Sequence, residues 1–387
     1  MSIVRNKQRG SVSLFVVIFA ALLIITVTVA FIRIMLQDQM QATSNDLSKS
    51  ALDSAYAGVE DAKRAVIHYQ QECPAGPSTN AVCDDWTDLM NGKNCDATQK
   101  VLGTVSSVVN GEVQVGNDVN LNQAYMCVNV KLDTPEYINT LLPGVSQVVP
   151  LKANKPFDTV TIEWFSRSDL DRSSVVGGTK PIVLTTSSLL KKKINWSPQT
   201  PSLMRAQLLQ FGQNFTMDDF DIANSTKANT ATVFMMPFPD STTNYKGDKL
   251  DFAIDYTSGA LQQVKCDSSF TSVGGAGNYG CKVALKLPLI NNRKGAYLRL
   301  QTPYNAQTNY RVTLSNSSTP VLFSGVQPEV DSTGRASDLF RRVVTRIDSK
   351  NNFAYIEGAL DIEGNLCKMF TVGERPEDYK PGTTCTP

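Results

Sequence analysis

The stretch that decides the fold reads SVSLFVVIFAALLIITVTVAFI, from Ser11 to Ile32, and contains no charged residue. As a helix rising ~1.5 Å per residue it would be roughly 33 Å long, enough to cross a ~30 Å hydrocarbon core. Arg5, Lys7 and Arg9 precede it, and no acidic residue balances them. Because basic flanks of a membrane span are retained in the cytoplasm, the sequence predicts a single-pass protein of the cytoplasmic membrane with its N-terminus inside and the rest of the chain exported.

The segment after Ile32 continues the helix in amphipathic form. From Arg33 to Gln71 there is no proline, and Gly58 is the one glycine. Small and apolar side chains recur at three- and four-residue spacing: Leu36, Met40, Leu47, Ala51, Ala55, Val59, Ala62, Val66 and Tyr69. This pattern predicts one helix over residues 11–72, with 11–32 transmembrane and 33–72 amphipathic. Its apolar stripe over residues 45–70 is expected to pack on the protein's own head.

The residues before the span indicate how the chain is processed. No small-residue cleavage site of the A-x-A type follows Ile32, so an ordinary secretory signal is not predicted. Instead Gln8-Arg9-Gly10 followed by Ser11-Val12-Ser13-Leu14-Phe15 resembles the class III leader of type IV prepilins. The resemblance implies a leader of residues 1–10, cleavage by prepilin peptidase between Gly10 and Ser11, and N-methylation of Ser11. It also implies a pilin-like fold.

The fifth residue after the cleavage site departs from the usual pilin pattern. Most pilins carry glutamate there, whereas this chain has Phe15. The departure resembles PilX-type minor pilins and the K-type pseudopilins of type II secretion. It implies a minor subunit of a type IV pilus or related filament, at its tip or in priming, that assembles with other pilin subunits through residues 11–45. The expected anchoring side chains are Phe15, Val16, Leu22 and Leu23.

Two alternatives stay open at this point. One is a K-type pseudopilin in a secretion machine, which the sequence barely separates from a minor pilin. The other is a single-pass membrane-anchored surface protein whose β-sandwich head binds a ligand. The latter predicts that the chain is not processed after Gly10.

The composition limits which partners the exported part can bind and shows that it can form a core. The 387 residues carry a net charge of +1, and without residues 1–10 there remain 34 basic and 36 acidic residues, a net charge of −2. A mildly acidic chain offers no field that would gather nucleic acid, so no nucleic-acid partner is predicted. At the same time, the 42% of hydrophobic residues is enough to form a core.

The eight cysteines all follow the span, and their even number on the exported side favours disulfides. They are Cys73, Cys83, Cys95, Cys127, Cys266, Cys281, Cys367 and Cys385. Proximity in sequence predicts the pairs Cys266–Cys281 and Cys367–Cys385. The pairing of the first four is open.

The remaining chain reads as an α+β head rich in antiparallel strands. Residues 73–125 are interpreted as a disulfide-pinned connector with a short helix around Trp86 that Gly92 ends. From about Val101 onward, β-branched runs punctuated by Gly, Asn and Pro predict strands, and residues 126–387 form the exported head. A polar stretch at 166–200 is a candidate boundary between two lobes, and a short helix is expected at Ala336–Phe340.

No motif in the head predicts catalysis, a metal or a cofactor. Gly275–Gly280 matches G-x-G-x-x-G, but a β-like run follows it where a dinucleotide site needs a helix. Ser188–Lys191 has S-x-x-K spacing without its companion motifs. His68 is the single histidine, which excludes most histidine-dependent triads. Asp218–Asp221 and Asp331 offer oxygen ligands that could suit calcium, but neither fits the twelve-residue EF-hand loop, and both are interpreted as solvated turns.

Overall fold

The computed structural model describes residues 10–73, 81–105, 108–115, 122–170, 180–184, 192–209, 230–239, 249–251, 261–270, 279–287, 296–304 and 307–348. It has one long helix, α1 (Gly10–Glu72), and two short ones, α2 (Ala81–Asn91) and α3 (Ala97–Leu102). The predicted continuous helix is therefore present, and α2 is the short helix expected around Trp86. The strand pattern expected from Val101 begins later, because Val101 lies in α3 and the first strand starts at Val108.

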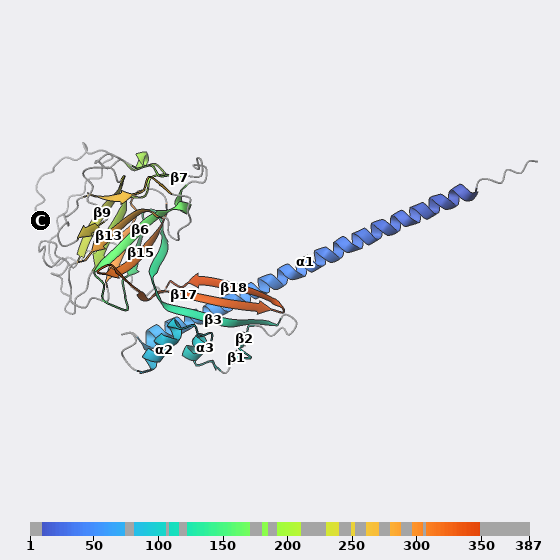
Figure 1. Ribbon diagram of the computed structural model, residues 1–387, viewed down its shortest axis with the longest axis horizontal. Coiled ribbons are helices and arrows are strands. Elements are labelled where there is room, and N and C mark those ends of the chain that lie inside the picture. The colour runs from blue at the N-terminus through green and yellow to red at the C-terminus, as the bar shows by residue number, and fades with distance from the viewer. Residues whose placement is uncertain are drawn as a thin grey trace, which may run out of the picture. The chain divides into compact units, whose positions relative to one another are not determined.

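The strands form two main sheets. The five-stranded sheet, called here the helix-bound sheet, has the order β1-β2-β3-β17-β18 and is antiparallel throughout. Its strands are β1 (Val108–Val109), β2 (Glu112–Gln114), β3 (Gln123–Thr134), β17 (Phe323–Ala336) and β18 (Leu339–Arg346). Figure 1 shows α1 running along β17 and β18, with its N-terminal half continuing beyond that sheet.

The eleven-stranded sheet is called here the head sheet. All of its strands lie in the chain between β3 and β17. Its main path is β16-β15-β6-β13-β11-β9-β8-β14-β5, with β10 beside β13 and β4 beside β15. Its strands are β4 (Glu136–Leu141), β5 (Ser146–Pro150), β6 (Thr159–Ser166), β8 (Met204–Leu209), β9 (Thr230–Pro239), β10 (Lys249–Asp251), β11 (Leu261–Cys266), β13 (Tyr279–Lys286), β14 (Tyr297–Gln301), β15 (Thr308–Asn316) and β16 (Thr319–Val321). A third, two-stranded sheet pairs β7 (Lys180–Pro181) with β12 (Ser269–Phe270), and short 3₁₀ turns lie at Arg167–Asp169 and Lys193–Asn195.

The expectation of an antiparallel head needs correction at two pairs. β9 runs parallel to β11, and β10 runs parallel to β13. Parallel neighbours need a long connection rather than a tight hairpin, and more than twenty residues separate the ends of each pair. The head sheet is therefore mixed, which alternation within single strands does not reveal.

Two further expectations change with the structure. Ala336–Phe340 is not a helix, because Ala336 pairs with Leu339 and the residues between them turn β17 into β18. The stretch 166–200 does not separate two sheets either, since β6 before it and β8 after it both belong to the head sheet.

Each main sheet has its own apolar core. The head core is lined by alternate residues of the head strands, among them Trp164, Met235 and Tyr310, which are all fully buried. The second core lies between α1 and the helix-bound sheet and contains Ala62, Val66 and Val130. The part of the predicted stripe over residues 45–70 is therefore the face that packs on the sheet, whereas Leu36 and Met40 are exposed.

The contact between α1 and β17 is unusually close because it is made by small residues. A Cβ built on Gly334 of β17 would lie 2.2 Å from the backbone O of Ala51 and 2.2 Å from the backbone N of Ala55. A Cβ on Gly58 of α1 would lie 2.4 Å from Ser332 Oγ. Glycine at both positions lets the two backbones approach closely, which explains why the predicted stripe is rich in small residues.

Candidate functional site

The first candidate site is the N-terminal half of α1. Every residue from Leu14 to Asp46 is exposed in the described structure. The predicted anchoring side chains lie in this half, and the exposed fractions of Phe15, Val16, Leu22 and Leu23 are 63%, 62%, 54% and 65%. Gly10, where cleavage is predicted, begins α1, and the side chain of Ser11 lies outside the described residues.

The chemistry of this half suits an apolar surrounding. A helix satisfies its own backbone N–H and C=O groups, as a lipid environment requires. The hydroxyl groups of both threonines in the apolar stretch are satisfied as well, because Thr26 Oγ1 donates to the carbonyl of Leu23 at 2.9 Å and Thr28 Oγ1 to that of Ile24 at 2.7 Å. By length and composition α1 is able to cross a membrane, and none of its most apolar stretch is buried against the rest of the chain.

Disulfides tie down the region that follows α1. Cys73 pairs with Cys83 and joins the end of α1 to α2, while Cys95 pairs with Cys127 and joins the start of α3 to β3. These two bonds settle the pairing that the sequence left open. The predicted Cys266–Cys281 bond is present and links β11 to β13. The predicted Cys367–Cys385 pair lies outside the described residues.

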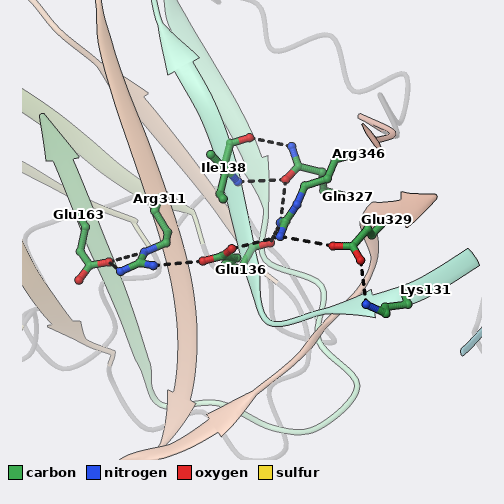
Figure 2. Close-up of polar contacts among 8 residues, drawn as sticks. All are labelled: Lys131, Glu136, Ile138, Glu163, Arg311, Gln327, Glu329 and Arg346. Carbon is green, nitrogen blue, oxygen red and sulfur yellow. Dashed lines mark hydrogen bonds and ion pairs between the residues drawn. The ribbon is translucent and has the colours of Figure 1, made fainter. Parts of the chain in front are cut away.

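The second candidate site is a chain of charged side chains, with one glutamine beside it, where the two main sheets meet; it is called here the junction network. It consists of Lys131, Glu136, Glu163, Arg311, Gln327, Glu329 and Arg346 (Figure 2). Positive and negative groups alternate along it, and the side chains of Arg311, Glu136 and Arg346 are 19%, 22% and 23% exposed.

Glu136 lies at the centre of this network. Its Oε2 accepts from Arg311 Nη1 at 3.3 Å, and its Oε1 accepts from Arg346 Nη2 at 3.1 Å. Arg311 also bonds Glu163 of the neighbouring strand β6. Burial by itself would lower the pKa of the Arg311 guanidinium, but the charges and hydrogen bonds of Glu163 and Glu136 outweigh burial and raise that pKa. The guanidinium is therefore held in its charged form.

Of the other candidate residues, the structure describes His68, Asp331 and the end of the glycine-rich loop. His68 packs against Trp86, with ring centroids 5.4 Å apart and ring planes tilted by 44°. Asp331 is a strand residue of β17 whose carboxylate pairs with Arg342, so the interpretation of this position as a solvated turn is wrong. In the Gly275–Gly280 stretch, residues 275–278 lie outside the described residues, whereas Tyr279 and Gly280 begin strand β13. Ser188–Lys191 and Asp218–Asp221 lie outside the described residues. Among the residues that the structure describes, no group of three or more His, Cys, Asp or Glu side chains is placed to hold a metal ion.

Sequence reasoning did not identify the junction network. Its members come from strands far apart in the chain. Lys131, Glu163, Arg311 and Arg346 lie in runs that the sequence predicts as strands, and Glu136, Gln327 and Glu329 lie outside those runs. The available signal was a charge within an otherwise β-branched or apolar run, as for Glu163 in TVTIEWFS and Arg311 in TNYRVTLSN. Such a charge indicates which face of a strand points away from the core, but it does not show which other side chain pairs with it.

Comparison of the chain with known protein families, curated proteins and solved structures finds no match. The fold and the two sites define an α+β protein with one long apolar N-terminal helix and a disulfide-bonded, β-rich head.

Proposed function

We propose that the chain is a minor subunit of a type IV pilus or a related filament, inserted in the membrane as a prepilin and assembled through α1. The observation that carries the proposal is the division of this single helix, 63 residues long. Its N-terminal half is apolar and exposed, while its C-terminal half packs on the helix-bound sheet through Ala51, Ala55 and Ala62.

This division supports a subunit that exchanges one apolar surrounding for another. Large apolar surfaces left exposed on a protein mark sites that lipid or other proteins cover. A helix with no charged residue from Ser11 to Ile32 can lie in a bilayer before assembly and against neighbouring helices after it. Phe15 favours a minor position at the tip or in priming, because the acidic group usual at that place is missing.

The proposal is tested by the mass of the N-terminal peptide of the protein purified from membranes. We expect a mature chain that begins at Ser11 with a methylated amino group, and the unprocessed chain in cells without prepilin peptidase. An intact Met1 would refute the proposal and favour an anchored surface protein, and a cleavage beyond Ile32 would refute it as well, because it would remove the membrane span. Gly10→Val, which places a branched side chain at the predicted cleavage site, should abolish processing, whereas Ser2→Ala should not change it.

The same Phe15 feature favours a K-type pseudopilin as the second candidate. The two functions differ in what fails when the gene is deleted. Loss of surface pili with intact protein secretion supports the minor pilin, and the opposite result supports the pseudopilin.

A further inference from the structure

The two main sheets are joined by a narrow neck of two neighbouring chain crossings. In the described part of the chain, the passage from the helix-bound sheet to the head sheet is made at Pro135, between β3 and β4, and the return is made at Leu322, between β16 and β17. The crossings lie side by side, because Phe323 pairs with Thr134.

The backbone of this neck is irregular. The pairing of β17 with β3 shifts register between Ser324 and Glu329, and Gly325 adopts a φ of +65° there. Pro135 and Pro328 lack the N–H that a regular ladder would use. The extra residues on β17 interrupt its ladder with β3 at this level, and such an interruption bends the strand. Backbone hydrogen bonds of Leu322 and Ser324 to the 152–154 segment hold the return crossing, so the orientation of the two sheets rests on these bonds and on side-chain contacts.

The apolar core changes along β17, from the head core at its start to the core under α1 further on. Phe323 and Val326 at the start of β17 belong to the head core, whereas Val330, a few residues later, belongs to the core under α1. The two cores are separate clusters, so the change from one to the other falls within the neck.

Polar contacts across the neck converge on three consecutive residues of β4. Gln327 binds both backbone groups of Ile138, with its Oε1 accepting from the N–H at 3.0 Å and its Nε2 donating to the carbonyl at 2.8 Å. Arg346 Nη1 donates to the carbonyl of Glu136 at 2.8 Å, and its Nη2 reaches the carboxylate of Glu136. Tyr137 Oη donates to Asp348 at 3.4 Å.

The junction network extends these contacts into both sheets. On the head side Glu136 pairs with Arg311, which in turn pairs with Glu163. On the side of the helix-bound sheet, Arg346 lies 3.9 Å from Glu329, and Glu329 pairs with Lys131 at 2.8 Å (Figure 2). Partly buried ion pairs in a network contribute more than isolated exposed ones, because their removal leaves charges without partners.

From this arrangement we infer that Glu136, held between Arg346 and Arg311, is a latch that fixes the head sheet relative to the helix-bound sheet, and that the neck becomes a hinge when the latch opens. This inference goes beyond the proposed function and does not depend on filament assembly. In an assembled subunit the latch would make the head follow every movement of α1, and release would let the head tilt while α1 stays in place.

The test is hydrogen–deuterium exchange of the full chain in detergent, comparing wild type, Glu136→Gln and Asp331→Asn. The control variant removes a carboxylate that pairs with Arg342 within the helix-bound sheet, away from the neck. We expect exchange in peptides covering 134–140 and 324–329 to rise about tenfold in Glu136→Gln while β6 and the 123–130 part of β3 keep their protection, and to stay unchanged in Asp331→Asn.

Unchanged exchange at the neck of Glu136→Gln would overturn the inference. An equal rise in β6 would overturn it as well, because it would indicate general destabilisation rather than a local opening. If Glu136→Gln does not fold, Gln327→Ala is the second variant, since it removes both bonds to Ile138 without leaving a charge unpaired. It should open the same two peptides, and protection equal to wild type there would contradict the latch.

Discussion

Replacement of Gly334 by alanine tests whether the packing of α1 on β17 depends on the close approach of their backbones. The added Cβ would lie 2.2 Å from the backbone O of Ala51 and 2.2 Å from the backbone N of Ala55. Both atoms belong to the helix backbone, so no side-chain rotation relieves the overlap, and α1 must move away from β17. Overpacking commonly costs ~1–3 kcal/mol, and a clash with two backbone atoms places this variant at the upper end, about 3 kcal/mol.

The free energy of unfolding is measured by urea titration of the full chain in detergent, followed by tryptophan fluorescence. Trp86 packs against the core under α1 and reports on this region. The matched control is Gly103→Ala, where an added Cβ meets no atom within 4 Å but φ is +68°. That variant should lose about 1–2 kcal/mol through backbone conformation alone. If Gly334→Ala loses no more than this control, the argument from close approach is refuted.

Three further predictions concern stability. Gly58→Ala should cost about 1 kcal/mol in thermal unfolding, less than Gly334→Ala, because its Cβ would overlap side chains, Ser332 Oγ at 2.4 Å and Val128 Cγ2 at 2.9 Å, and not the backbone of another element. Joint replacement of Cys95 and Cys127 by serine should lower the free energy of unfolding by about 4 kcal/mol, and joint replacement of Cys73 and Cys83 should lower it by about 3 kcal/mol. The difference is expected because the disulfides close loops of 32 and 10 residues. Equal losses would contradict the argument from loop entropy. Burial raises the pKa of Tyr137 from 10.0 to about 12, so the stability held by its neutral form is complete below pH 10 and is lost as pH rises toward 12. The loss should reach about 3 kcal/mol, and ultraviolet absorbance of the phenolate should show no titration of Tyr137 near pH 10 while the protein is folded.

The helix could be predicted because its signals are local. The uncharged run from Ser11 to Ile32, the three- and four-residue spacing that follows and the proline after Cys73 all act over a few residues. The same holds for most strands, whose β-branched alternation is visible in runs such as the one around Ile162. Local patterns also placed the Cys266–Cys281 pair, since its two cysteines are only 15 residues apart.

Tertiary structure decided how these elements combine. Alternation along a strand tells which side chains share a face, but not which strand lies beside it, so the parallel pairing of β9 with β11 and the split into two sheets were out of reach. The same limit applies to Glu136 and Arg346, which are 210 residues apart in the chain. By itself the sequence determined a long apolar helix followed by a β-rich, cysteine-paired head, because hydropathy and periodicity are properties of neighbouring residues. Only the tertiary structure determined the packing of α1 against Gly334 and the latch at Glu136, because both depend on how segments far apart in the chain are aligned.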